Sequence, residues 1–269
     1  MVGGLLLRGM LVGVIAGLLA FGFARVFGEP QIDRAIAFEE LMTKATTSAP
    51  VAAHTHDATA AGGVHTHDNA PEAELVSRDT QAGLGLLTGV VIYGAAIGGL
   101  FALVFAFAYG RVGHLGARAT AALLALGAYV AIVLVPNIKY PASPPAVGNP
   151  DTVGSRTGLF FLMIVVAVAA LILAVALAQR LRTRLGTWNA AILAGVTFAV
   201  FIAIVQYALP SVDEVPDQFS AVVLWRFRAA SLGIHAVLWT TIGLLFGALT
   251  ERSMAAQVGR TIAARSLAR

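Results

Sequence analysis

Long apolar stretches separated by short polar segments run along most of the chain. Those that approach the roughly 20 residues a helix needs to span a bilayer are residues 5–27, 83–108, 117–135, 159–180, 189–209 and 228–249. The pattern predicts an all-α integral membrane protein, a bundle of six transmembrane helices. In this interpretation residues 1–27 form the first helix and residues 83–250 hold a five-helix core.

The polar segments between these stretches alternate in charge, and this alternation predicts the orientation. One set is basic and carries a single acid, Glu251; its arginines are Arg111, Arg118, Arg180, Arg182, Arg184, Arg252, Arg260, Arg265 and Arg269. The other set is acidic and includes residues 28–82 and 210–220. Cytoplasmic loops are enriched in Lys and Arg. We therefore expect both termini, including the basic tail of residues 251–269, to be cytoplasmic, and residues 28–82 to be extracytoplasmic.

Composition supports a membrane protein and narrows the possible partners. The chain is 58% hydrophobic and 12% charged, with a mean hydropathy of +0.82, whereas about a quarter of the residues in soluble domains are charged. The lipid bilayer is thus the expected environment. The pI near 9.8 does not indicate a nucleic-acid partner, because the arginines are spread over short loops. The absence of cysteine excludes disulfides and thiolate metal sites.

Two further features concern the first helices. The first stretch resembles a secretory signal in its position, but it is long, and "AFGFARVFG" offers no clean cleavage site of the Ala-x-Ala type, so we expect it to be retained. Glycines recur four residues apart in the first two stretches, at Gly9, Gly13, Gly17, Gly85, Gly89, Gly94 and Gly98. Small residues at this spacing let helix backbones approach closely in lipid. The glycines therefore predict tight helix packing.

The acidic loop of residues 28–82 has two parts. Residues 29–45 mix acids with apolar positions at helical spacing, which indicates a short amphipathic helix. Residues 45–73 are rich in Ala, Thr, Gly and Pro. They have too little apolar content to fold alone, so we expect a disordered, histidine-containing outer loop.

This loop contains the tetrapeptide His-Thr-His-Asp twice, as His54, His56 and Asp57, then as His65, His67 and Asp68. Residues i and i+2 of an extended chain point the same way, so each copy offers two imidazoles and a carboxylate to one ion. Neutral imidazole suits Co²⁺, Ni²⁺ and Zn²⁺. We expect the loop to capture such a divalent metal, with no tightly bound cofactor. The alternative is a neutral low-complexity linker in which histidine is incidental.

Charged and polar residues also gather where three acidic-side segments meet the bilayer. These residues are Arg78, Asp79, Gln81, Lys139, Tyr140, Asp151, Arg156, Asp213, Glu214, Trp225, Arg226 and Arg228. Charges near spans mark pathways or pair with one another, and we expect the three segments to cluster. The alternative is interfacial anchoring by Trp and Tyr together with snorkelling by Lys and Arg. Arg228 lies deeper, which favours a structural ion pair.

His235 follows Arg228 by two helical turns on a similar face of the last stretch. It is the histidine expected well inside the bilayer. A buried, hydrogen-bonded imidazole and an intramembrane metal or proton relay are both compatible with that position.

The sequence contains none of three motifs that are typical of enzymes. The chain has no phosphate loop, no His-Glu-x-x-His and no GxSxG. We therefore expect it not to be an enzyme.

Three stretches carry a family resemblance: "SRDTQAGLGLLTGVVIYGAAIGGLF", "VPNIKYPASPPAVGNPDTVGSRTGLFFL" and "LPSVDEVPDQFSAVVLWRFR". They resemble the CbtA family of probable cobalt transporters over nearly the whole chain. The resemblance implies a bacterial inner-membrane protein that takes up cobalt for cobalamin biosynthesis, accompanied by a small single-span protein of the CbtB type. The matching motif positions are Arg78, Gln81, Lys139, Tyr140, Pro141, Pro144, Pro145, Arg156, Glu214, Trp225, Arg226 and Arg228.

Three classes of function are compatible with a membrane protein of this kind, and one of them, a membrane enzyme, would require paired acid and base residues in one cavity, which the sequence does not display. The first is uptake of a divalent transition metal, cobalt above others, with the histidine loop as an external collector. A homo-oligomer or a CbtB-like protein is a possible further requirement of the pathway. The second is a metal-sensing or accessory scaffold that supports another permease without transporting metal. A cavity reaching His235 from outside would favour the first class, whereas the lack of a polar path would favour the second.

Overall fold

The structure, a computed structural model, describes residues 2–47, 77–111, 113 and 115–267, and these contain helices and no strand. The elements in chain order are α1 (Val2–Phe23), η1 (Ala24–Gly28), α2 (Glu29–Thr47), α3 (Arg78–Thr80), η2 (Gln81–Gly85), α4 (Leu86–Ala108), α5 (Ala117–Ala128), η3 (Tyr129–Leu134), α6 (Val135–Lys139), η4 (Pro150–Thr152), α7 (Val153–Ala208), α8 (Ala221–Thr241), η5 (Ile242–Phe246) and α9 (Gly247–Leu267). Here η4 is a 3₁₀ turn, and the other four η elements are π-helical turns.

Within the described residues, five helical runs are long and apolar enough to cross a membrane. They are Val2–Ala45, Arg78–Ala108, Ala117–Lys139, Pro150–Ala208 and Ala221–Gln257. Large apolar side chains such as Phe107, Leu173 and Ile204 point outward, with 70%, 69% and 62% of their surface exposed. Apolar surface on this scale is suited to lipid rather than water. The chain is thus an all-helical, multi-pass membrane protein.

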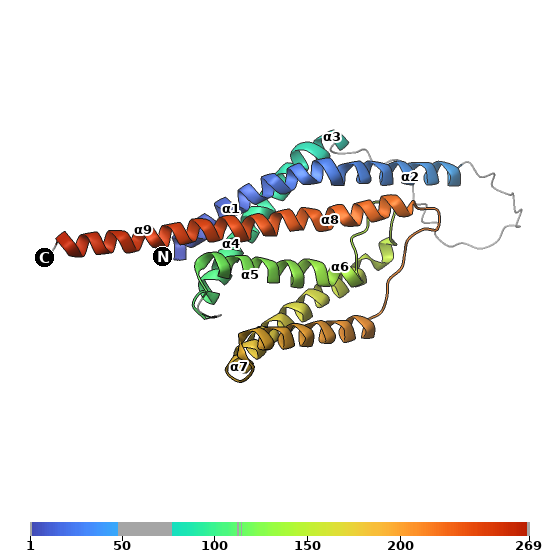
Figure 1. The fold of residues 1–269 in the computed structure, drawn as a ribbon. Coiled ribbons are helices and arrows are strands. Elements are labelled where there is room, and N and C mark those ends of the chain that lie inside the picture. The colour runs from blue at the N-terminus through green and yellow to red at the C-terminus, as the bar shows by residue number, and fades with distance from the viewer. Residues whose placement is uncertain (1, 48–76, 112, 114, 268–269) are drawn as a thin grey trace, which may run out of the picture.

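The predicted stretches 159–180 and 189–209 both lie in the long run α7, which accounts for five runs where six were expected. Gly186 interrupts α7 with φ 76° and ψ 164°, a left-handed conformation suited to glycine. Figure 1 shows that α7 folds back on itself. Met163 and Ala167 from the first arm pack in one cluster with Ile202 from the second.

Helices α1 and α4 touch backbone to backbone at five of the predicted glycines, whereas a Cβ on Gly89 would meet no described atom within 4 Å and one on Gly85 only its own Thr80; the five are Gly9, Gly13, Gly17, Gly94 and Gly98. A Cβ on Gly13 would overlap the carbonyl oxygen of Gly94, and one on Gly17 would lie 2.8 Å from the carbonyl oxygen of Val90. The prediction of tight packing is confirmed for this pair. In the main core beside these helices, Phe101, Phe105 and Phe246 meet in edge-to-face contacts.

The π-helical turns η1 and η3 both lie against the middle of α8. Gly28 of η1 faces Ile234, with 3.7 Å between its would-be Cβ and Cδ1. Tyr129, which begins η3, donates its hydroxyl proton to the carbonyl of Leu232 at 3.4 Å. The turn η3 also precedes Pro136, so the third helix continues through this proline to Lys139. The predicted apolar stretch ended at residue 135, but the helix runs on because a π turn accommodates a residue that lacks an N–H.

The two ends of the bundle differ. The terminal end holds the start of α1, the Gly186 turn and α9 (Figure 1), and Gln179 of α7 reaches the carbonyl of Arg111 there at 3.5 Å. The opposite end, here named the loop end, is formed by α2, α3 and residues 140–152 and 209–220. Helix α2 continues directly from η1, and its Phe38 packs edge-on against Phe219 at 5.1 Å. The predicted amphipathic helix of residues 29–45 is therefore confirmed as an extension of α1.

Candidate functional site: a polar cavity at the loop end

A cavity of about 450 Å³ opens at the loop end between residues 137–160, residues 212–215 and α8. Its polar and charged lining residues are Asn137, Tyr140, Ser143, Arg156, Thr157, Asp213, Glu214, Arg228, Ser231 and His235. Segments distant in the sequence thus supply one site. The predicted clustering holds for two of the three segments, those following α6 and α7.

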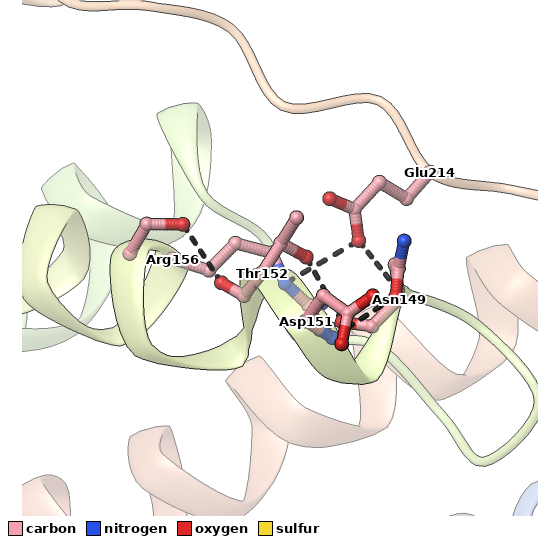
Figure 2. A network of polar contacts seen from close by, with 6 residues as sticks. Asn149, Asp151, Thr152, Arg156 and Glu214 are labelled. Carbon is pink, nitrogen blue, oxygen red and sulfur yellow. Dashed lines mark hydrogen bonds and ion pairs between the residues drawn. The ribbon is translucent and has the colours of Figure 1, made fainter. Parts of the chain in front are cut away.

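The rim of the cavity is fixed by a network around Glu214 (Figure 2). Glu214 Oε2 accepts from the backbone N–H of Asn149 at 2.7 Å and lies 3.4 Å from Arg156 Nε. The Arg156 contact is an ion pair and not a hydrogen bond, because the Nε–H is not aimed at the oxygen. The Arg156 guanidinium instead donates from Nη2 to the Asn149 carbonyl at 3.2 Å.

The Asn149 hydrogen bond, followed by Thr152 and Arg156, lowers the pKa of Glu214 below its ordinary value. The side chain is 21% exposed. Glu214 is therefore ionised around neutral pH and joins residues 209–220 to residues 140–156.

Gly148 makes this rim possible. Its φ is 111°, in the region that favours glycine. A Cβ at this position would lie 2.7 Å from Arg156 Nη2 and closer still to Nη1. Any larger residue would therefore displace the guanidinium that holds the rim.

Tyr140 anchors the other side of the rim. Its hydroxyl donates to the carbonyl of Pro210 at 2.9 Å, and the residue is 8% exposed. Burial raises the pKa of Tyr140, so the hydroxyl stays protonated and available to donate. Gln206 of α7 donates from its side-chain amide to the carbonyl of Val135 at 2.9 Å. Both side chains tie the end of α7 to the end of α6.

One face of α8 forms the inner wall. Arg228, Ser231 and His235 follow one another at spacings of three and four, so they share a helix face. In place of the predicted ion pair, Arg228 Nε donates to the carbonyl of Ala142 at 3.4 Å. His235 Nδ1 is buried and has no hydrogen-bond partner within the described ranges. The imidazole therefore presents an unused nitrogen inside the protein.

His235 also lines a second cavity of about 370 Å³ between α1, α4 and α8. Its walls are apolar apart from Tyr93 and His235, whose rings meet edge-on with centroids 6.5 Å apart. His235 thus separates a polar cavity from an apolar one.

Comparison with models of protein families shows to which family the chain belongs. The model of the family described as "Probable cobalt transporter subunit (CbtA)" matches residues 2–251. The chain belongs to the CbtA family. No curated protein and no solved structure matches it.

The motif residues of this CbtA chain divide between the cavity and its surroundings. Tyr140, Pro141, Arg156, Glu214 and Arg228 line the cavity.

Arg78, in contrast, lies with α2. It pairs with Glu29 at 2.5 Å and with Asp33 at 3.2 Å, and the Glu29 side chain is 6% exposed. These partners differ from the acids considered in the sequence analysis. Gln81 begins η2, where its N–H donates to the carbonyl of Ser77 at 3.0 Å.

The other motif residues are not among those that line the cavity. Trp225 is 72% exposed, and with Arg226 it lines a groove shared with Phe23 and Phe27 of the first helix. Such a position matches the interfacial anchoring considered as an alternative. Lys139 lies at the end of α6 and is not among the residues that line the cavity.

The two His-Thr-His-Asp copies lie outside the described residues, which end at 47 and resume at 77. Within the described ranges, no three His, Cys, Asp or Glu side chains are grouped so that they could hold a metal. Among the described residues that line the cavity, His235 is the one imidazole, and Asp213 and Glu214 are the carboxylates.

Sequence reasoning missed Ser231, Gly148 and Asn149. Ser231 could have been found, because it lies on the helical face that joins Arg228 to His235. Gly148 and Asn149 carry no such periodic pattern, and their roles depend on where Arg156 and Glu214 meet.

Proposed function

We propose that this chain is the membrane component for uptake of a divalent transition metal, cobalt before nickel or zinc. The observation that carries the proposal is the loop-end cavity, which brings five family motif residues and His235 into one lining. Membership of a family described as a probable cobalt transporter subunit supports the choice of metal. In this proposal His235 receives the metal at the deep end of the cavity.

The proposal includes six crossings of a bacterial inner membrane, with both termini in the cytoplasm. The reversal at Gly186 lets α7 supply two crossings. The arginine-rich segments, including Arg180, Arg182 and Arg184 before the reversal, fall at the terminal end. The cavity at the loop end then opens to the outside.

The external collector is the segment that contains His54, His56, Asp57, His65, His67 and Asp68. This segment leaves from α2 and returns at α3, and both helices belong to the loop end with the cavity. Metal captured there would be released beside the cavity. Imidazole binds metal as the neutral base, so capture should weaken below about pH 6.

The test is the whole-cell content of Co, Ni, Zn, Cu and Mn at sub-micromolar supply. Cells express the wild type, a variant with all four loop histidines changed to alanine, His235→Ala, or no protein. We expect cobalt accumulation in the wild type, less in the loop variant and none above background in His235→Ala. His114→Ala, a change of the histidine in a basic segment, is the matched control. Wild-type cells that accumulate no cobalt, even with a single-span CbtB-like protein co-expressed, would contradict the proposal.

A second candidate is an accessory or metal-sensing scaffold for another permease. It is favoured by the lack of a three-ligand metal group within the described ranges. Purified protein in liposomes separates the two functions. Cobalt flux supports the transporter, whereas metal binding without flux, with or without the CbtB-like protein, supports the scaffold. Measuring the mass of the purified particle shows whether flux accompanies a homo-oligomer.

A further inference from the structure

We propose that the loop-end cavity takes its metal as an anionic complex with a small carboxylate ligand, rather than as a hydrated cation. The inference rests on the proposed function and specifies the chemical form of its substrate. It follows from three features of the described lining: a cation that makes no ion pair, a single imidazole and the order of residues along α8.

Arg228 is the lining cation that makes no ion pair within the described residues, although Asp213 and Glu214 match Arg156 and Arg228 in number. Of the two carboxylates in the lining, Glu214 already forms an ion pair with Arg156 and accepts a hydrogen bond from the Asn149 N–H. Within the described residues, Arg228 makes one hydrogen bond, from Nε, and no ion pair, which leaves its terminal nitrogens without a hydrogen-bond acceptor. Asp213, the other carboxylate, acts on this guanidinium only through space. A fixed guanidinium repels a bare divalent cation but attracts an anion.

The one imidazole in the described lining is His235, and Asp213 is the lining carboxylate that is not held by Arg156. The Nδ1 of His235 is buried and unpartnered, and no group of three His, Cys, Asp or Glu side chains is present in the described part of the chain. Divalent transition metals take four to six ligands, so one imidazole leaves most positions to be filled by ligands that travel with the metal. Carboxylate oxygens can fill them and also neutralise the ion. A guanidinium binds a free carboxylate edge with two parallel hydrogen bonds.

The order along α8 suits such a complex. Arg228 and His235 are seven residues apart, about 10 Å along the helix axis, with Ser231 between them. Helical side chains lean toward the N-terminus of their helix, which for α8 is the loop end. Arg228 therefore stands at the mouth and His235 deeper. A volume of about 450 Å³ has room for a small metal chelate between them.

The experiment is calorimetric binding to the full chain in lipid nanodiscs, with Co²⁺ alone, citrate alone and cobalt citrate as probes. We expect cobalt citrate to bind about tenfold or more tightly than Co²⁺. Arg228→Gln should weaken cobalt citrate binding by about tenfold or more, because it removes charged hydrogen bonds. Arg226→Gln, two residues away and outside the cavity, should leave binding unchanged. His235→Ala should weaken cobalt citrate but not citrate alone.

Two results would overturn the inference: Co²⁺ binding as tightly as its complex, or complex binding that is insensitive to Arg228→Gln. If that variant does not fold, comparing the binding of Co²⁺ and of cobalt citrate to the wild type still tests the inference. Arg228→Lys keeps the charge but loses the paired hydrogen bonds. Its affinity for cobalt citrate should therefore lie between those of the wild type and Arg228→Gln.

A parallel measurement of radioactive cobalt flux into liposomes separates this inference from the proposed function. Flux of free Co²⁺ that falls as citrate is added would overturn the inference and leave the function intact. Tight binding of the complex without flux would support the inference and contradict transport. If the protein shows neither tight binding of the complex nor cobalt flux, the inference and the proposed function are both contradicted.

Discussion

The backbone N–H of Asn149 donates to Glu214 Oε2 at 2.7 Å and joins residues that are 65 positions apart in the sequence. The bond closes the rim of the loop-end cavity, and it is the largest cause of the lowered pKa of Glu214. Stability at this rim should therefore depend on pH.

For Glu214, a pKa below the ordinary 4.5 means that the ionised carboxylate stabilises the folded state. That contribution is complete above the ordinary value and is lost as pH falls through the lowered folded pKa. We expect Glu214→Gln to lower the melting temperature at neutral pH, and the gap from wild type to close on acidification. Thermal unfolding in detergent, from neutral pH down through the lowered pKa of Glu214, measures this difference in melting temperature. Asp217→Asn, an exposed acid of the same segment, is the control, and a gap that persists in acid would refute the prediction.

The contact between α1 and α4 predicts a large difference between two glycines of α1. Gly13→Ala would place a methyl group against the backbone of Gly94, whereas a Cβ on Gly22 meets no described heavy atom within 4 Å. Overpacking of this kind typically costs about 1–3 kcal/mol. Gly13→Ala should therefore lower the melting temperature and Gly22→Ala should not. Equal effects would mean that the two helices are not in backbone contact.

The ion pairs of Arg78 predict unequal effects at its two acids. The Glu29 side chain is 6% exposed and that of Asp33 is 62% exposed. Breaking a buried pair typically costs about 3–5 kcal/mol, and an exposed one about 0–1 kcal/mol. In Glu29→Gln, Asp33 still faces Arg78, so the loss of stability should lie toward the lower end of the range for buried pairs. Asp33→Asn should leave the stability nearly unchanged. Chemical denaturation measures both variants, and a larger loss for Asp33→Asn would contradict the assignment.

The reversal at Gly186 predicts where single cysteines react. The chain contains no cysteine, so a lone Thr187→Cys or Asp217→Cys can be labelled without background. We expect a membrane-impermeant maleimide to label Asp217→Cys on intact cells, and Thr187→Cys only after the membrane is opened. Labelling of Thr187→Cys on intact cells would exclude six crossings with cytoplasmic termini.

Much of the architecture could be predicted from residue patterns. The length of the apolar stretches identified the helical membrane protein, and the spacing of Gly9, Gly13 and Gly17 identified a close helix contact. The helical interval between Arg228 and His235 placed both on one wall. These predictions depend on local periodicity, which the sequence displays directly.

Other features depend on tertiary contacts and could not be predicted. The helix passes through Pro136 because a π turn precedes it, and no residue pattern announces such a turn. Arg78 pairs with Glu29 and Asp33, which are distant in sequence, because α2 continues the first helix to the same level. The two copies of His-Thr-His-Asp remain a prediction, because they lie outside the described residues.

The backbone contact between α1 and α4 has a mechanical consequence. The closest contacts of Gly13 and Gly17 are with the backbone of α4, so this part of the helix pair can neither slide nor rotate without losing its contact. The facing wall is different, because α7 reaches the bundle chiefly through the cluster around Ala131, Val135 and Tyr140. If the chain transports metal as proposed, we expect the α7 hairpin to move against the α1–α4 pair when access to His235 changes.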